Sequence, residues 1–484
     1  MAGRRTGQAD DSERPVLVWF RDDLRLADHP ALHAAASAGT VAALYVLDPA
    51  QGGGAQMWWL HHSLDAFARD LARHGVRLIL RRGRAGDIVP EVAKSVGAAS
   101  VQAIVSPLPW LREADRGVGA RLEVPLQLHV GGSLVDLSQV RAGSGRPYTV
   151  YSPFARAILK SGPPPAPLPV PVLRAAEVGA VASDQLDDWG LLPKRPDWAG
   201  GLRGMWTPGE RGAAARLEAF LEDGLEGYDR ARDMAGDENG TSHLSPHLRW
   251  GEISPRQVWH ALGDRQGSDA QRFRAELLWR DFAANLLMQR PELPERALRA
   301  EFERLPWRRD AGALADWQRG RSGIPIVDAG MRQLWHTGWM HNRVRMIVAS
   351  WLTKHLLIDW RGGAAWFLDT LVDGDLASNS ANWQWVAGCG TEAQPFFRIF
   401  NPLTQARKFD ADGAYVREWV PELAKLPDRW LHQPWAAPEA VLGAAGVRLG
   451  EDYPRPAIGL DEGRNRALAA FGRHVKGHAR AAAA

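Results

Sequence analysis

The first 140 residues alternate short apolar runs with longer amphipathic stretches, and this alternation constrains the fold more than any other feature. The apolar runs lie at 16–20, 41–46, 76–80 and 101–105, with amphipathic stretches such as 59–74 and 88–96 between them. Buried strands that alternate with helices predict a parallel, doubly wound α/β sheet of the Rossmann-like kind. A ligand is expected beyond the carboxyl ends of such strands, near 21–25 or 107–112. Neither G-x-G-x-x-G nor a P-loop pattern occurs, which excludes the usual nucleotide fingerprints.

Proline and glycine interrupt this pattern in the next part of the chain. Gly-Pro-Pro-Pro at 162–165 and the prolines at 167, 169 and 171 predict an irregular connector that wraps the surface. Helical segments follow at 211–223, 254–262, 270–288, 326–337, 343–357 and 363–371. The sequence therefore predicts an α/β domain over 14–140, a connector over 141–209 and an all-α domain over 210–478.

Composition limits the class of protein further. A chain of 484 residues is long enough for two domains, and it has no run of about 18 apolar residues that would span a membrane. The N-terminus lacks an apolar signal region, and the single Cys389 excludes an internal disulfide, so we expect a cytoplasmic protein. A net charge of +3 is weak support for nucleic acid. The 22 Trp exceed what packing ordinarily demands and raise the question of stacking or electron transfer.

The segment GTSHLSPHL at 240–248 places three hydroxyl groups at the start of a predicted helix. Free N–H groups and the helix dipole make such a start an anion site, to which Thr241, Ser242 and Ser245 would add donors. Ordinary N-capping by Ser or Thr is the alternative explanation.

The segment VDGDLASNSANWQW at 372–385 carries Asp373, Asp375 and Asn379. It is consistent with an Asx-rich turn that caps a helix, or with a polar cluster around a heterocycle. The ligand spacing and terminal Glu of a calcium-binding EF-hand are missing, so no metal is expected.

A third pair of segments, ELLWRDF at 276–282 and WMHNRVRM at 339–346, interleaves basic and aromatic residues. Glu276 and Arg280 lie four residues apart, where a salt bridge within one helix is the simple explanation. Trp279 is consistent with a core position. The same interleaving also suits a surface that stacks bases and holds phosphates.

Taken together and in this order, the motifs resemble the photolyase/cryptochrome flavoprotein family, most of all its class I and related microbial dimer photolyases. The resemblance runs from VLVWFRDDLR at 16–25 to about Pro434. It is densest from Tyr228 to Asp410, where GTSHLSPHLRWGEISPR, ELLWRDF, GIPIVDAGMRQLWHTGWMHNRVRM and DGDLASNSANWQW match. It implies an α/β antenna domain and a helical domain that binds FAD.

The resemblance also assigns flavin contacts. The residues implied to hold FAD are Tyr228, Thr241, Ser242, His243, Leu244, Ser245, Glu276, Arg280, Arg345, Asp373, Gly374, Asp375 and Asn379. Within this set, Arg345 would pair with Asp373, and Asn379 would face the flavin N5. Plant cryptochromes tend to carry Asp at that position. A neutral amide suits a reduced, anionic flavin, so Asn379 favours repair over light sensing.

Two further sets follow from the resemblance. The implied electron relay is Trp383, Trp360 and Trp307, outward from the flavin. The implied contacts to DNA are Arg232, Glu276, Trp279, Arg280, Asn342, Arg343, Met346, Trp385, Arg398 and, with less support, Lys408. Repair enzymes for the (6-4) photoproduct show a His-rich version of the segment around Asn342, which this chain lacks.

The activity implied by the resemblance is light-driven repair of cyclobutane pyrimidine dimers by an electron from reduced FAD (FADH⁻). The expected partner is damaged DNA, bound by a monomer with no obligate protein partner and no membrane. Methenyltetrahydrofolate is the expected antenna because the WWLHHSL segment at 58–64 resembles plant-cryptochrome-related members; deazaflavin is the alternative. A cryptochrome-type light receptor and a light-independent nucleotide-binding scaffold are the competing functions.

Overall fold

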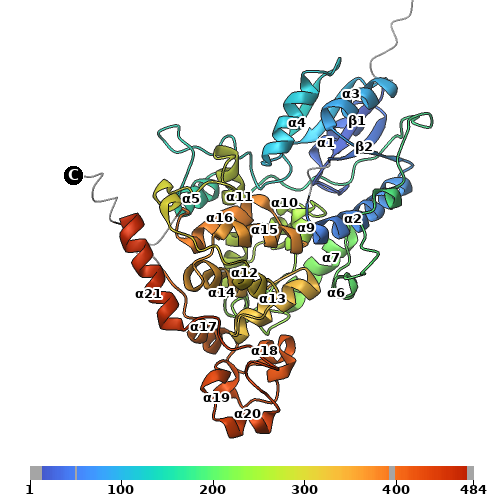
Figure 1. Cartoon of the computed structure of the whole chain (residues 1–484). Coiled ribbons are helices and arrows are strands. Elements are labelled where there is room, and N and C mark those ends of the chain that lie inside the picture. Colours follow the sequence, from blue (N-terminus) through green and yellow to red (C-terminus); the bar gives the residue numbers. More distant parts are fainter. Residues whose placement is uncertain (1–13, 49–51, 392–397, 477–484) are drawn as a thin grey trace, which may run out of the picture.

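The computed structural model describes residues 14–48, 52–391 and 398–476, and it folds into an α/β domain and a larger helical domain (Figure 1). Both predicted fold classes are confirmed. Residues 477 and 478, at the end of the predicted helical domain, lie outside the described residues.

Five parallel strands form the sheet of the α/β domain, in the order β3-β2-β1-β4-β5. They are β1 (Val16–Phe20), β2 (Val41–Leu47), β3 (Leu78–Arg82), β4 (Ser100–Ile104) and β5 (Leu126–His129). The central strand β1 pairs in register with β2 at Val16↔Val41 and with β4 at Val16↔Ser100. Strand β5 has no counterpart among the expected runs. As a four-residue edge strand with Leu128 42% exposed, it lacks a continuous apolar pattern.

Helices cover both faces of this sheet because alternate residues of the buried strands point to opposite sides. Val16, Val18 and Phe20 enter one apolar core, whereas Leu17 and Trp19 enter the other. The covering helices are α1 (Pro30–Ala38), α2 (Gly54–Arg73), α3 (Ala85–Ser95) and α4 (Pro109–Gly119).

The connector is more ordered than its prolines suggest. It contains α5 (Tyr151–Lys160), the 3-10 turn η2 (Leu186–Trp189) and α6 (Gly200–Met205). The proline-rich part between α5 and η2 is irregular, as expected, and it runs beside β2. There the Val41 N–H donates to the Arg174 carbonyl at 2.7 Å and the Ala176 N–H to the Val41 carbonyl at 3.0 Å.

The rest of the chain is helical. Its longer helices are α7 (Glu210–Ala219), α10 (Pro255–Ala261), α11 (Ser268–Gln289), α12 (Ala311–Gln318), α13 (Pro325–Thr337), α14 (Asn342–Ser350), α15 (Trp360–Thr370), α16 (Leu376–Ala387), α17 (Pro402–Phe409), α18 (Ala414–Trp419), α20 (Glu439–Ala445) and α21 (Leu460–Phe471). Short helices α8 (Tyr228–Ala231), α9 (Ser245–Arg249) and α19 (Asp428–Leu431) lie between them. The six predicted helices are present with shifted ends. The one expected over 343–357 ends as α14 at Ser350 and continues as a π-helical turn, Trp351–His355.

None of the helices in the described ranges combines the length and hydropathy that a bilayer span requires. In the same ranges, no three His, Cys, Asp or Glu side chains gather as a metal site would need.

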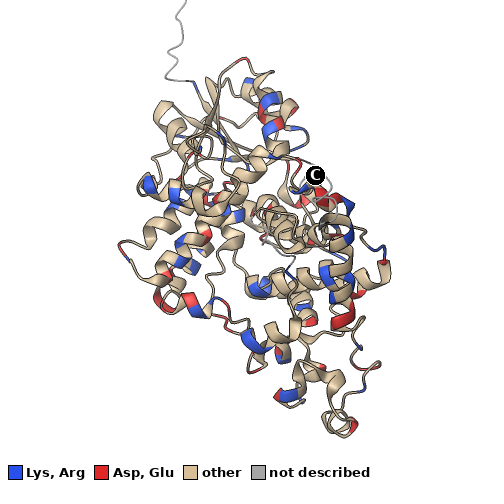
Figure 2. Cartoon of the chain, turned by 90° about the vertical axis from the view of Figure 1, so that its left-hand side faces the viewer, with Lys and Arg blue, Asp and Glu red and all other residues tan. Residues whose placement is uncertain are grey.

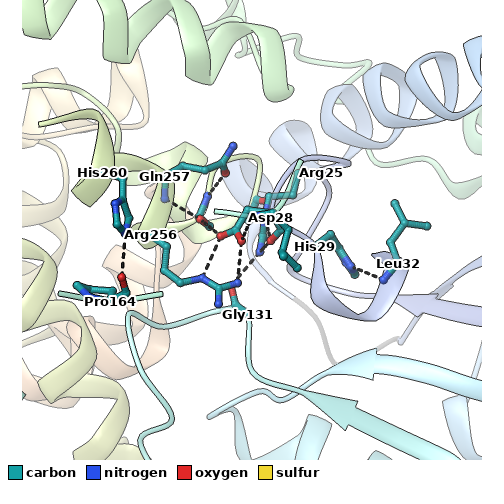
Figure 3. A network of polar contacts seen from close by, with 12 residues as sticks. Arg25, Asp28, His29, Leu32, Gly131, Pro164, Arg256, Gln257 and His260 are labelled. Carbon is teal, nitrogen blue, oxygen red and sulfur yellow. Dashed lines mark hydrogen bonds and ion pairs between the residues drawn. The ribbon is translucent and has the colours of Figure 1, made fainter. Parts of the chain in front are cut away.

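A buried carboxylate joins the two domains (Figure 3). Arg256 donates from Nη2 to Oδ1 of Asp28 at 2.8 Å and from Nε to Oδ2 at 3.0 Å. The Ser254 hydroxyl donates to Oδ2 at 2.5 Å, and the Leu168 N–H of the connector donates to Oδ1 at 3.1 Å. Asp28 is fully buried, so this carboxylate holds the α/β domain, the connector and the helical domain together.

Arg25 completes this junction from the α/β side. Its guanidinium donates to the carbonyls of Asp28 and Gly131, each at 2.8 Å, and of Gly251 at 3.0 Å. Nearby, Arg249 pairs with Asp22 at 2.9 Å. Segment 21–25, where a ligand was expected, therefore lies largely inside the domain junction, because the helical domain docks on the carboxyl end of β1.

Candidate functional site

The three hydroxyl groups of segment 240–245 differ in their hydrogen-bond partners. Ser242 Oγ accepts from the Leu244 N–H at 3.3 Å, a local turn before the helix; the N-cap of α9 is Leu244, so neither Ser242 nor Thr241 is the N-cap that the sequence left open. Ser245 begins α9, and its hydroxyl donates to Oδ2 of Asp373 at 2.6 Å. Thr241 Oγ1 is buried without a hydrogen-bond partner. Helix α9 thus brings this segment against the start of the 372–385 segment.

The predicted ion pair between Arg345 and Asp373 is present. Arg345 Nη2 donates to Asp373 Oδ2 at 2.8 Å, and its Nε donates to the Met340 carbonyl at 2.7 Å. Asp373 Oδ1 is buried and has no partner. This carboxylate therefore keeps one oxygen available for a further donor.

The next residues set the geometry of α16. Asp375 is its N-cap and accepts from the Ser378 N–H at 2.7 Å, so the Asx-cap explanation holds for this carboxylate. A Cβ on Gly374 would lie 2.6 Å from Nε2 of Gln56 on α2, so the two domains approach closely here and a larger residue would displace the Gln56 side chain. One turn into α16, the buried Asn379 donates from Nδ2 to the Ala364 carbonyl at 3.0 Å.

Two neutral histidines lie beside these groups. Burial lowers the pKa of His243 and of His341 to about 4 each, so both rings are uncharged near pH 7. His341 Nδ1 accepts from the Arg343 N–H at 3.2 Å, so the ring proton is on Nε2. Trp339 lies next to both rings, with centroids 4.4 Å from His243 and 6.3 Å from His341.

A group of unsatisfied buried polar atoms lies in this region. In the described part of the chain, the orphaned atoms here are Thr241 Oγ1, His243 Nδ1, Asp373 Oδ1, His341 Nε2, Arg232 Nε and Arg343 Nε. Buried polar groups are nearly always hydrogen-bonded, so a concentration of exceptions indicates a polar ligand. Donors and acceptors occur together, which fits a molecule that carries phosphates, hydroxyls and a heterocycle, as FAD does.

Tyr228 lies at the edge of the region and is nearly fully buried. It begins α8 and packs edge-on against Phe273, with ring centroids 5.3 Å apart. Burial raises the pKa of its phenol well above the usual value, so the hydroxyl stays neutral.

Glu276 pairs with Arg232, not with Arg280. Arg232 Nη1 lies 2.7 Å from Glu276 Oε1, so the salt bridge expected within the helix is wrong. Burial raises the pKa of Glu276, and Arg232 partly offsets this effect. Arg280 donates to the Gly132 carbonyl of the α/β domain at 2.7 Å and to the Leu248 carbonyl of α9 at 3.2 Å. Arg280 therefore braces the domain junction, and the structure does not place it with the other expected site residues.

Helices α14 and α16 supply four of the expected DNA contacts, Asn342, Arg343, Met346 and Trp385. Asn342 is exposed at the start of α14, and Met346 lies one turn later, 3.9 Å from Arg343 Nη1. Arg343 also pairs with Asp233 at 2.5 Å. Trp385, on α16, is half-buried with its ring centroid 6.5 Å from that of Phe400.

Arg398 and Lys408 lie further along the chain. The exposed Arg398 lies 4.8 Å over the Phe400 ring, and Lys408 lies 5.1 Å over Phe409. No motif reasoning identified Asp233, the partner of Arg343. Its position directly after Arg232 is the one signal that the sequence offered.

The three expected relay tryptophans share one apolar core. Trp383 and Trp360 are buried, and Trp307 is half-buried against the same core. A Cβ on Gly363, one turn after Trp360, would lie 2.2 Å from the Trp383 ring, so α15 and α16 touch closely here. Arg308 donates its N–H to the Leu357 carbonyl at 2.7 Å, which brings the Trp307 segment beside the start of α15.

The comparisons with known proteins agree with this architecture. A model of DNA photolyase matches residues 16–172, and a model of the FAD binding domain of DNA photolyase matches residues 273–473. The deoxyribodipyrimidine photo-lyase of Agrobacterium fabrum is 48% identical over 467 residues, covering 94% of this chain and 97% of that protein. Cryptochrome-1 of Arabidopsis thaliana is 36% identical, covering 93% of this chain and 69% of that protein.

A solved structure extends the similarity to three dimensions. The crystal structure of a bacterial class III photolyase from Agrobacterium tumefaciens has a TM-score of 0.93 and 47% sequence identity, and it covers 98% of this chain and 100% of that one. The fold and the site thus define a two-domain protein with a helical FAD-binding domain. The chain belongs to the photolyase/cryptochrome family.

Proposed function

We propose that this protein repairs cyclobutane pyrimidine dimers in DNA, driven by light and by reduced FAD held in the helical domain. The observation that carries the proposal is the concentration of orphaned polar atoms between α9, α14 and the start of α16. The activity named for the Agrobacterium fabrum relative supports it. The similarity to a class III structure favours that subclass over the class I assignment suggested by the motifs.

The flavin would be held by residues from four segments of the helical domain: Tyr228, Thr241 to Ser245, Arg345, and Asp373 to Asn379. The hydroxyl of Thr241 and the Nε2–H of His341 supply neutral donors, and Asp373 Oδ1 supplies an acceptor. Asp375 contributes mainly by capping α16. When bound, reduced FAD supplies an excited electron that the lesion accepts.

Asn379 would face the N5 of a reduced flavin. One amide hydrogen donates to the Ala364 carbonyl, and the side-chain carbonyl oxygen can accept a further hydrogen bond. A reduced flavin carries a proton on N5, which such an acceptor would hold. The neutral amide adds no negative charge beside an anionic ring.

The lesion would lie between Trp279 and Trp385, with Met346 as an adaptable apolar contact. Flipping a base pair out of the duplex costs a few kcal/mol, and it costs less for a damaged pair than for an intact one. This difference favours binding of damaged DNA without recognition of the base sequence. Glu276 would hydrogen-bond the pyrimidine edge, and Asn342 would contact the same lesion. Burial raises the pKa of Glu276, and Arg232 beside it partly offsets this effect.

Phosphate contacts would come from Arg232, Arg343, Arg398 and Lys408. Figure 2 shows Lys and Arg spread over both domains with Asp and Glu among them, in keeping with a net charge of only +3. DNA affinity would therefore depend on this local group, and it should fall as salt rises. A flat salt response would contradict it.

The tryptophans Trp383, Trp360 and Trp307 would carry an electron inward to oxidised FAD, in that order from the flavin. Their shared core supports short separations between rings. Replacement of Trp383 by Phe should block photoreduction of the oxidised flavin while chemically reduced protein still repairs.

The antenna would be methenyltetrahydrofolate, with deazaflavin as the alternative. The indoles of Trp58 and Trp59, in the segment that suggested folate, are both buried on α2, and the Trp59 N–H donates to Glu252 of the helical domain at 2.9 Å. They would therefore shape the antenna domain rather than form an open face. Extraction and absorption spectroscopy of the native chromophore tests the assignment.

Illumination of reduced protein with a dimer-containing oligonucleotide tests the main proposal, with restored thymine absorbance as the readout. Oxidised protein kept in the dark serves as the control. A cryptochrome-type receptor is the second candidate, because the chain is 36% identical to Cryptochrome-1. Intact dimers after illumination, with the flavin still reduced, would favour the receptor.

We further propose a cytoplasmic monomer whose three parts divide near residues 140 and 209. Sedimentation of the purified holoprotein tests the oligomeric state.

A further inference from the structure

Tyr151, in the connector, stacks directly on Trp279. The two ring centroids lie 3.6 Å apart and the ring planes differ by 4°. Tyr151 begins α5, far in sequence from α11, which carries Trp279. The two rings therefore lie face to face in van der Waals contact.

Additional contacts fix Tyr151 against α11. Its hydroxyl donates to the Ala275 carbonyl at 3.2 Å, one turn before Trp279 on the same helix. One turn into α5, Phe154 is fully buried and packs 5.4 Å from Phe282. The Phe282 ring in turn meets Tyr151 and Trp279 edge-on, at 5.9 Å each. Tyr151 is therefore anchored independently of Trp279.

This arrangement leaves Trp279 ordered yet accessible. The indole is 38% exposed, although Tyr151 covers one face. Its exposed surface therefore lies on the part of the ring that Tyr151 and Phe282 leave open. A surface tryptophan without such support would sample several rotamers, and binding would have to freeze them.

We propose that Tyr151 is a positioning residue for the lesion: it holds the Trp279 indole in the orientation whose open face meets the flipped pyrimidine dimer. This inference rests on the proposed repair function. The connector thereby takes part in lesion recognition, although no motif of the chain pointed to it.

Equilibrium binding in the dark tests this proposal on the flavin-loaded protein. Tyr151→Ala should weaken binding of a dimer-containing oligonucleotide by about three- to tenfold, the loss expected for one aromatic stack and a disordered side chain. Its affinity for undamaged DNA and its repair yield per bound lesion should stay unchanged. Tyr151→Phe keeps the ring and should bind as the parent protein does.

Two comparisons separate positioning from a general structural role. If Tyr151 acts through Trp279, the double variant Tyr151→Ala/Trp279→Ala should bind no more weakly than Trp279→Ala alone. Trp335→Ala serves as a matched control, because Trp335 is 56% exposed and stacks on Trp366 at 5.9 Å, away from α11. Trp335→Ala should change neither the affinity for the dimer-containing oligonucleotide nor the affinity for undamaged DNA.

Several outcomes would overturn the inference: unchanged or tighter dimer binding by Tyr151→Ala, an equal loss for undamaged DNA, or additive losses in the double variant. Tighter binding would mean that Tyr151 competes with the lesion for Trp279. If the parent protein itself neither prefers nor repairs dimers, the proposed function fails instead.

Discussion

Two buried polar clusters of this molecule look similar in composition but differ in how completely they are satisfied. At the domain junction, both carboxylate oxygens of Asp28 and all three guanidinium nitrogens of Arg25 have protein partners. In the cluster around Asp373, one carboxylate oxygen and the Thr241 hydroxyl have none. The bonded groups of Asp28 and Arg25 stabilise the fold, whereas the unpaired atoms around Asp373 are free to bond a ligand.

The largest expected effect is at the junction. Asp28→Ala would leave the guanidinium of Arg256 buried without its carboxylate and should lower the free energy of unfolding by about 3–5 kcal/mol. Urea denaturation followed by circular dichroism measures this change. Asp28→Asn retains hydrogen-bonding atoms and should lose less; equal stability of Asp28→Ala and the parent would refute the role of this carboxylate.

Asp281 tests an intermediate case, because it is a junction carboxylate with only one oxygen bonded. Its Oδ2 accepts from the Leu134 N–H at 2.8 Å, and burial raises its pKa from 3.8 to about 7. Between about pH 4 and 7, the folded state thus retains a proton that the unfolded state releases. The contribution of Asp281 to the free energy of unfolding therefore falls as pH rises through this interval.

We therefore expect Asp281→Asn to become more stable relative to the parent over that pH interval, by about 2–4 kcal/mol in total, and then to level off. Thermal denaturation of both proteins across pH 4–8 measures the difference. A constant difference across the series would contradict the raised pKa.

In the polar cluster around Asp373, a substitution should weaken flavin binding more than it lowers the free energy of unfolding. Asp373→Ala should weaken flavin retention by about 10- to 100-fold, equivalent to the loss of a charge-assisted hydrogen bond. The free energy of unfolding should change by only about 1 kcal/mol, because its partner Arg345 is 23% exposed. Flavin release on dilution, followed by fluorescence, measures retention. A large loss of stability without loss of flavin would show that Asp373 stabilises the fold, as Asp28 does, and does not bind the flavin.

The smallest expected effect is at Glu276. Glu276→Ala should lower the repair yield by about three- to tenfold, the loss of one hydrogen bond to the lesion, while flavin content stays constant. Glu276→Gln can still accept from Arg232 and should retain more activity. An unchanged yield in Glu276→Ala would show that the lesion does not depend on this residue.

Much of the architecture was predictable from local sequence. Apolar runs such as 16–20 predict a sheet that is buried on both faces. The six helical segments predicted beyond residue 210 are present with shifted ends. The edge strand β5 and helix α5 were missed, because neither shows a distinctive local pattern: one is half-exposed and the other sits in a proline-rich region. Part of the tryptophan content is structural, since Trp206, Trp250 and Trp317 donate to backbone carbonyls within the core.

The sequence by itself determined the fold class and the motifs that resemble a flavin-dependent repair family, because periodicity and motif spacing are local properties. Only the tertiary structure decided the partners: Glu276 with Arg232 instead of Arg280, Arg280 with the domain junction, and Tyr151 with Trp279. These choices depend on which helices pack together, and contacts between residues distant in sequence leave no local periodic signal.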